Sequence, residues 1–283
     1  MSNVVIVTDS TNCLPPHLIR EYGIRIVSVG LVIDGKSYRD SDLSNDEFWR
    51  LFYQAKKLPA TSAASPGDFA NVFTDIAKST DAIVCIVLSK VLSATHEAAV
   101  QASKIVKTEN PNVEIEVIDS KTATGALGFI VLEAAHAAQR GKSIAEVIQV
   151  VQDMIPKVKF VVGMDTLKYL IKTGRSPKTG YIGELLQVKP IVGMVSGTGL
   201  VELLGRVRGK RKCMLRLAEL VKEHIDTTKP IHLMVHYTDG ITPGTELKEI
   251  VTSGMKCEEL YLTPYTPVMA SASGPVVALS FYS

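Results

Sequence analysis

Small hydroxyl and carboxyl side chains follow three apolar runs in the first half of the 283-residue chain. They are Asp9 to Thr11 after VVIVT, Ser89 to Thr95 after AIVCIVL, and Asp119 to Thr122 after VEIEVI. In an open α/β sheet, ligands bind outside the carboxyl ends of the strands. Hydroxyls beside the free N–H groups of helix N-termini form an anion site. We therefore expect an anion to bind where these runs end.

A further segment, LPATSAASPG, carries Thr61, Ser62 and Ser65 in what we predict to be a loop before a helix. The hydroxyls lack the glycines and the lysine that usually accompany a phosphate site, and they favour a singly charged carboxylate. Ser, Thr and Asp are also the commonest helix caps. Capping is the favoured role for Ser65, Asp9 and Ser120. For Thr61, Ser62 and Ser93, capping and ligand contact both stay open.

Enzyme motifs are missing from the chain. Gly205 to Arg211 has the wrong spacing for a phosphate-binding loop, and Gly197-Thr-Gly199 lacks the third glycine of a dinucleotide fingerprint. A triad of a serine with Asp119 has no partner histidine, because His96 lies inside the helix after Ser93. We predict no catalytic residue. The alternative is a small-molecule α/β enzyme, a phosphotransferase or hydrolase, that uses Asp9, Asp119 and the hydroxyl segments.

Composition limits the remaining classes of function. The net charge of +2 argues against a nucleic-acid surface. No apolar run reaches the roughly 18 residues of a membrane span, and the start MSNVVIVTDS has no basic segment of a signal peptide, so we expect a cytoplasmic protein. The four cysteines lie far apart and fit reduced thiols. His232 and His236 share one face of a predicted strand, and a structural pair is favoured over a metal site.

Two domains are expected from the pattern of elements. Strands and helices alternate over residues 1–157, which predicts a parallel α/β/α domain. Within it, residues 24–40 are extended with a turn at Asp34-Gly35. Residues 158–283 contain the strand-like runs KFVVGM, KPIVGMVS, VELLGRV, KPIHLMVHYT, KCEELYLTP and PVVALSFYS with fewer helices. They predict an α+β domain with a mixed sheet.

A series of short motifs resembles the DegV family over essentially the whole chain. The first are VTDST, YRD at Tyr38 to Asp40, PATSAASP for the family's P-x-T-S-Q-P, and LSKVLSAT for its L-S-S-x-L-S-G-T. VIDSKTATGALG, TLKYLIKTGRSP for L-x-x-L-x-x-G-G-R, LLQVKPIV, GRVRGKRK and SGPVVALSFY complete the series. The resemblance implies a two-domain α/β protein that buries one long-chain fatty acid between its domains and needs no other cofactor.

Members of the family act as the acyl-carrying subunit of bacterial fatty-acid kinase. They present the carboxylate to a separate ATP-binding kinase subunit, which makes the acyl-phosphate. By motif match, the carboxylate would be held by Thr61, Ser62, Ser93, the Ala94 amide and Thr95. Arg175 would contact the partner or the acyl-phosphate, with a solvated helix charge as the alternative.

Two departures from the family pattern concern this site. Ala272-Ser-Gly-Pro-Val276 replaces H-x-G-P-G, so the histidine that helps to hold the carboxylate is missing. A water, Ser271 or Ser273 is expected to stand in for it. Ala94 replaces the glycine of the second hydroxyl loop, and Thr173 replaces the first glycine before Arg175.

Two further segments have a functional and an ordinary interpretation. One is a cluster of basic residues: Arg206, Arg208, Lys210, Arg211 and Lys212. The cluster is either a docking patch, which would bind the kinase or make transient contact with an anionic membrane, or an ordinary solvated face. The apolar residues of Ile130 to Ala135 and of Ser143 to Ile155 line either an acyl tunnel or an ordinary core.

Overall fold

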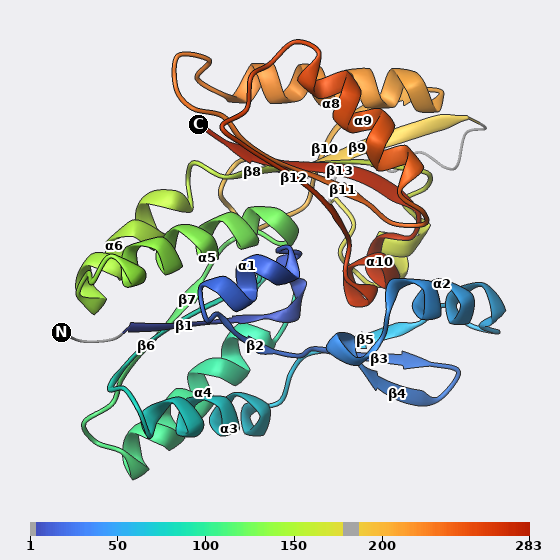
Figure 1. Cartoon of the computed structure of the whole chain (residues 1–283). Helices are drawn as coiled ribbons and strands as arrows, with labels where there is room; N and C mark the ends of the chain where they lie inside the picture. Colours follow the sequence, from blue (N-terminus) through green and yellow to red (C-terminus); the bar gives the residue numbers. More distant parts are fainter. Residues whose placement is uncertain (1–3, 178–186) are drawn as a thin grey trace.

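A computed structural model of the chain describes residues 4–177 and 187–283. Its N-terminal part contains a parallel sheet of four strands in the order β2-β1-β6-β7 (Figure 1). The strands are β1 (Val4–Asp9), β2 (Arg25–Val27), β6 (Ala82–Val87) and β7 (Glu114–Asp119). Every residue of β6 is buried, as expected for a central strand that is covered on both faces.

Helices cover both faces of this sheet. The helices are α1 (Pro16–Glu21), α3 (Pro66–Ala77), α4 (Thr95–Glu109), α5 (Thr124–Gln139) and α6 (Ile144–Met154). Figure 1 shows α3 and α4 on one face and α1, α5 and α6 on the other. Ser65 caps α3 and Ser143 caps α6, each in a capping box with the acidic residue three positions on. The capping role predicted for Ser65 is confirmed.

Residues 30–62 leave the parallel sheet and form a small antiparallel sheet with its own helix. The sheet has the order β4-β3-β5, with β3 (Gly30–Ile33), β4 (Lys36–Arg39) and β5 (Ala60–Ser62), and α2 (Asn45–Gln54) follows the short 3-10 helix η2 (Asp40–Asp42). Asp34 and Gly35 both have positive φ, as a two-residue hairpin requires, and they form the predicted turn. Thr61 and Ser62 lie in β5, so the prediction of a loop there is wrong. The pairing of β5 with β3 explains the difference.

The C-terminal part contains a mixed sheet of six strands in the order β10-β9-β8-β13-β11-β12. The strands are β8 (Lys159–Met164), β9 (Val188–Met194), β10 (Glu202–Arg208), β11 (His232–Tyr237), β12 (Glu259–Pro264) and β13 (Val276–Tyr282). Only β11 and β12 pair in parallel. The predicted fold class, a parallel-sheet region followed by a mixed-sheet region, is confirmed.

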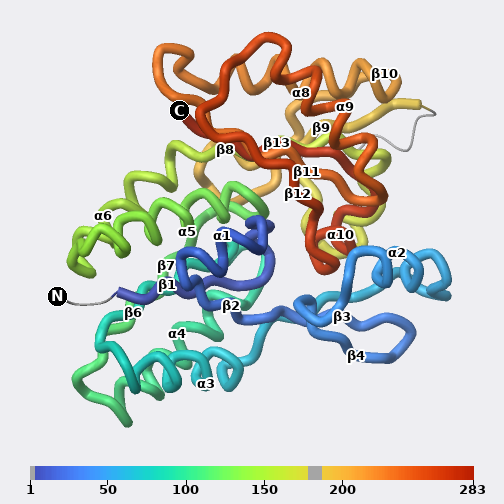
Figure 2. The backbone as a smooth tube through the Cα atoms, viewed as in Figure 1, coloured from blue at the N-terminus to red at the C-terminus, as the bar shows by residue number. Residues whose placement is uncertain are grey.

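Long helices cover one face of the mixed sheet, and short helices lie near its ends (Figures 1 and 2). The long ones are α8 (Lys210–His224) and α9 (Thr242–Thr252), and the short ones are α7 (Lys168–Lys172) and α10 (Pro267–Ser273). The predicted domain boundary after residue 157 falls between α6 and β8 and stays a prediction. Leu185 and Leu186 of the LLQVKPIV motif lie outside the described residues. No helix in the described ranges is long and apolar enough to cross a bilayer.

Helix α5 lies between the two large sheets and contacts both. It packs on β1 and β6 on one side and on β8 and β13 on the other, and twelve of its 16 residues are buried. Glycines permit this close approach: a Cβ atom on Gly125 would lie 2.5 Å from Nε2 of His236, and one on Gly128 would lie 2.6 Å from the Asn12 carbonyl oxygen. The ring of Phe129 contacts Tyr282 of β13 edge-on at 5.1 Å. The helix therefore fixes the spacing between the sheets.

Gly125→Ala should lower the free energy of unfolding by about 1–3 kcal/mol, because the added methyl group meets the His236 ring. Helix propensity alone would favour alanine by about 1 kcal/mol, so a loss of stability reports the clash. Gly67→Ala is the matched control, since Gly67 lies in α3 with only Ser65 Oγ nearby, at 3.6 Å. Urea unfolding compares the two variants. Equal stability would contradict close packing of α5 against β11.

Candidate functional site

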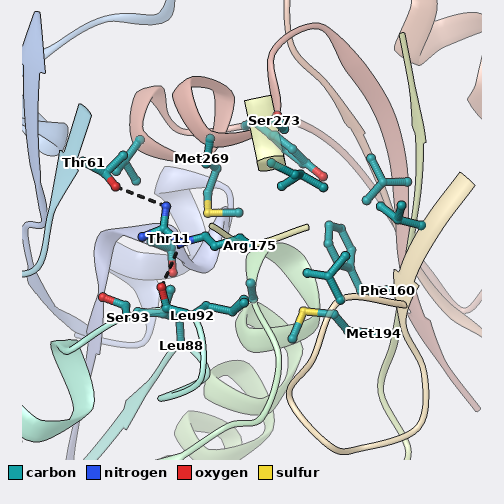
Figure 3. A pocket seen from close by; sticks show the side chains of 18 of the residues that line it. Thr11, Thr61, Leu88, Leu92, Ser93, Phe160, Arg175, Met194, Met269 and Ser273 are labelled. Atoms are coloured by element: carbon teal, nitrogen blue, oxygen red, sulfur yellow. Dashed lines mark hydrogen bonds between the residues drawn. The ribbon is translucent and has the colours of Figure 1, made fainter. Parts of the chain in front are cut away.

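A pocket lies where the parallel sheet, the small antiparallel sheet and the mixed sheet meet. Most of its lining is apolar, and the residues in it with polar or charged side-chain groups are Thr11, Thr61, Ser62, Ser93, Arg175, Tyr265 and Ser273. Figure 3 shows Thr61, Ser93 and Arg175 on one side of the pocket and Phe160 and Met194 on the other. The guanidinium group thus lies on one side of the pocket, and the apolar side chains of Phe160 and Met194 lie on the other.

The loop after β6 brings Ser93 to the pocket. Ser89, the first hydroxyl of this loop, is fully buried and donates to the Gly199 carbonyl at 2.9 Å, so it joins two loops and does not line the pocket. Ser93 is partly exposed, lines the pocket, and shares a 2.9 Å hydrogen bond with the Thr95 hydroxyl. Ala94 is exposed and Thr95 is buried, and neither lines the pocket. Of the three residues predicted in this loop, the structure therefore places only Ser93 in the pocket wall.

The two acidic residues at the strand ends are occupied by backbone donors. Asp9 is fully buried and accepts from the Thr11 and Leu88 amides at 2.9 and 2.8 Å. Burial raises the pKa of Asp9, and these hydrogen bonds lower it. Asp119 accepts from the amides of Lys90 and Lys121 at 3.2 and 3.0 Å. Asp9 therefore caps as predicted, and neither acid of the alternative enzyme hypothesis lines the pocket.

Arg175 follows α7 and reaches into the pocket wall. Its Nε donates to the Leu92 carbonyl at 2.8 Å and its Nη1 donates to the Thr61 hydroxyl at 3.2 Å (dashed lines in Figure 3). Burial lowers the pKa of Arg175, yet a guanidinium group stays charged in proteins. Arg175 is half-buried and lies in the pocket lining, so it is not a freely solvated charge at a helix end. It places a positive charge next to Thr61 and the Ser93 loop.

Helix α10 supplies the pocket wall that contains Ala272, the position at which we expected a histidine to be replaced. Ala272 and Ser273 line the pocket, as do Val268 and Met269 at the start of the helix. Ser271 is buried outside the lining. Of the two serines expected to replace the histidine, only Ser273 faces the pocket, and its hydroxyl donates to the Gly274 carbonyl at 3.0 Å.

Strands β8 and β9 form the apolar wall. Phe160, Val162 and Met164 alternate along β8 and therefore share one face. In β9, Met194 pairs with Phe160 and Val192 pairs with Val162, so they extend the same wall. The predicted alternative of a tunnel lined by Ile130 to Ala135 and by Ser143 to Ile155 is wrong. None of those residues lines the pocket, because they pack in the core around α5 and α6.

Within the described ranges, no three His, Cys, Asp or Glu residues are grouped so that they could hold a metal ion. The predicted histidine pair has separate partners. His232 lies 2.7 Å from the Glu259 carboxylate and stacks on Tyr282, and His236 lies 3.0 Å from the Ser280 hydroxyl. Burial lowers the pKa of His236 to about 3, so it is neutral. Both histidines have structural partners.

Comparisons with known proteins match the whole chain. A family model with the description "Uncharacterised protein, DegV family" matches residues 3–283. A DegV domain-containing protein of Caldanaerobacter subterraneus subsp. tengcongensis is 38% identical over 224 residues, 78% of each chain. Among solved structures, a DegV family protein from Thermus thermophilus that binds fatty acid has a TM-score of 0.90 at 27% identity, covering 100% of both chains. DegV of Bacillus subtilis, a fatty acid binding protein, has a TM-score of 0.89 at 25% identity over 100% of this chain and 99% of the other.

Proposed function

The chain belongs to the DegV family, whose solved structures include fatty-acid-binding proteins, and we propose that it binds one long-chain fatty acid in the pocket between its sheets. One observation carries the proposal: a guanidinium group and two hydroxyls lie at one end of a pocket that is otherwise mostly apolar. A long-chain fatty acid has the same division, with one charged group at the end of an apolar chain.

The carboxylate is proposed to lie beside Arg175, Thr61 and Ser93. Two N–H groups of Arg175 are used by Leu92 and Thr61, and the remaining N–H groups suit the two oxygens of a carboxylate. Ser62, which also lines the pocket, is a further hydroxyl within the lining. Hydrogen bonds to a charged group contribute about 1.5–3 kcal/mol each.

The acyl chain is proposed to extend along β8 and β9 past Phe160, Val162 and Met194. Each methylene buried against this wall contributes about 0.8 kcal/mol, so the tail supplies most of the affinity. We propose a binding protein and not an enzyme, since the acids of the alternative hypothesis, Asp9 and Asp119, are held by backbone amides outside the lining.

Native mass spectrometry of the purified protein tests the function directly. The wild type should carry, or take up, one molecule of fatty acid such as palmitate or oleate. Thr61→Ala with Ser93→Ala should lower the affinity at least about tenfold, because two donors to the carboxylate are lost. Ser79→Ala is the control, because the Ser79 hydroxyl donates to the Ile76 carbonyl at the end of α3, outside the pocket lining. A wild-type protein that accepts no fatty acid would refute the proposal, and full loading of the double variant would place the carboxylate elsewhere.

Arg175→Gln should weaken fatty-acid binding by about tenfold to a hundredfold, because a charge-assisted pair becomes a neutral hydrogen bond. The loss should be smaller for an acyl amide, which carries no charge. Arg25→Gln is the matched control, since Arg25 pairs with Asp75 at the surface. Titration with a fluorescent fatty acid measures both variants. Equal losses for acid and amide would show that Arg175 only supports the loop of Leu92.

We propose further that the protein presents its acyl carboxylate to a separate ATP-binding kinase subunit. Arg175 lies where it would also face the phosphate of an acyl-phosphate, for which its planar fork is suited. The docking surface is proposed to include Arg206, Arg208, Lys210, Arg211 and Lys212. All five side chains are exposed, and none forms an ion pair with another described residue.

This second step is tested by mixing the fatty-acid-loaded protein with ATP and the kinase subunit of the same organism, with hydroxylamine present to trap acyl-phosphate as hydroxamate. Hydroxamate should form only when both proteins are present. We propose that this basic surface docks on an acidic surface of the kinase subunit. Arg208→Glu with Arg211→Glu should then slow hydroxamate formation at least about tenfold, because the reversed charges repel that surface, while fatty-acid binding is unchanged. Arg25→Glu serves as the charge control. Absence of hydroxamate with a kinase that is active on another carrier would contradict the partner proposal.

A further inference from the structure

Asp40, the last residue of the YRD motif, is buried at the junction of three segments. Its side chain is 2% exposed and its Oδ1 accepts from the Val268 amide at 2.8 Å. The Ser10 hydroxyl, at the end of β1, and the Thr266 hydroxyl, just before α10, lie beside the same carboxylate. Asp40 thereby links the carboxyl end of the parallel sheet, the small antiparallel sheet and α10.

Asp40 acts on α10 as an N-terminal cap supplied from another part of the chain. The residue at the cap position, Thr266, makes no side-chain hydrogen bond to the helix, and the Val268 amide in the first turn is satisfied by Asp40 instead. Val268 and Met269, on the same turn, line the pocket. A change at Asp40 therefore reaches the pocket through α10, although Asp40 itself does not line it.

The charge on Asp40 has no cationic partner among the described residues. The titratable groups that face it are Asp9, the last residue of β1, and Cys13, which follows the 3-10 helix Ser10–Asn12 after β1. Cys13 in turn faces Tyr265. Burial raises the pKa of Asp40 to about 6 and the nearby Asp9 adds to the increase, while the hydroxyls of Ser10 and Thr266 and the hydrogen bond from the Val268 amide oppose it. Asp40 thus changes charge close to neutral pH.

We propose that Asp40 is a positioning residue for the fatty-acid site: its carboxylate anchors the first turn of α10 and so holds the pocket wall formed by Val268 and Met269. The inference rests on the proposed function. An ionised carboxylate accepts a stronger hydrogen bond from the Val268 amide than a protonated one does, and it is favoured by the positive end of the helix. The bound fatty acid is therefore held more tightly when Asp40 is charged.

The sign of the pH dependence follows from this anchor. Above pH 6 the carboxylate is ionised and the wall is held, and as the pH falls through about 6 the group is protonated and the bond to Val268 weakens. Repulsion between Asp40 and the fatty-acid carboxylate would have the opposite sign. Arg175, which lies in the lining and supplies the countercharge, offsets that repulsion.

Asp40→Asn tests the anchor, because the amide keeps the shape and one acceptor oxygen but carries no charge. Release of a fluorescent long-chain fatty acid is measured from about pH 5 to about pH 8, with Asp42→Asn, an exposed residue of the same 3-10 helix, as the control. Above pH 6, Asp40→Asn should release the probe about tenfold faster than the control. The increase in release that the control shows on acidification through about pH 6 should be absent from Asp40→Asn.

Two further measurements distinguish positioning from a general loss of structure. Thr266→Val removes a hydroxyl that lowers the pKa of Asp40, so the midpoint of the pH profile should move to higher pH. Hydrogen exchange without ligand should be faster for the α10 amides of Asp40→Asn and unchanged for those of β6. Slower release from Asp40→Asn, or unchanged α10 exchange, would overturn the proposal. If the wild type binds no fatty acid, the proposed function fails, and the exchange data alone decide whether Asp40 anchors α10.

Discussion

The packing of α5 between the two large sheets determines where every other part of the site lies. The helix is buried on the sides that face β1 and β6 and also on those that face β8 and β13, and Gly125 and Gly128 leave no room for side chains at the two closest approaches. Its first residue follows Ala123, which lines the pocket. The hydroxyl-bearing strand ends and the apolar wall of β8 and β9 are therefore set at a fixed distance on either side of one rigid element. A ligand that bridges them has a polar end and an apolar end at defined places.

The electrostatics of the site follow from what is buried around it. Asp9 and Asp40 both lie behind the lining and have raised pKa values because burial disfavours their charged forms. Arg175 is the one charged residue of the lining itself. A single cation with neutral hydroxyls matches a monocarboxylate better than a phosphate dianion, for which proteins usually add backbone amides from glycine-rich loops. The single positive charge of the lining suits a monocarboxylate, and the apolar wall suits an apolar chain attached to it.

Much of the fold is readable from the sequence because its signals are local. Apolar runs predict the strands, Ser65 marks a helix start, and Asp34-Gly35 marks a hairpin. Asp9, Ser89 and Asp119 lie at one edge of the sheet, as expected for residues at the carboxyl ends of parallel strands, because β1, β6 and β7 are neighbours. The site itself depends on contacts that no local pattern encodes. Thr61 lies in a strand of three residues, the Arg175 bonds span 83 and 114 positions, and the bond between Asp40 and Val268 spans 228. Periodicity places Phe160, Val162 and Met164 on one face of β8 but does not say which face meets the pocket.

The alanine at position 272 changes which groups are available to hold a carboxylate. Ala272 lies in the lining and has no donor, and Ser273 beside it already donates to the Gly274 carbonyl. Arg175 already contacts the segment of Thr61 and the segment of Leu92, and its guanidinium plane retains N–H groups for a ligand. In the proposed binding mode, arginine and hydroxyls hold the carboxylate without a histidine. Because arginine does not titrate near neutral pH and the pKa of Asp40 is raised to about 6, the proposed pH response of this site depends on the α10 wall and not on the groups proposed to touch the ligand.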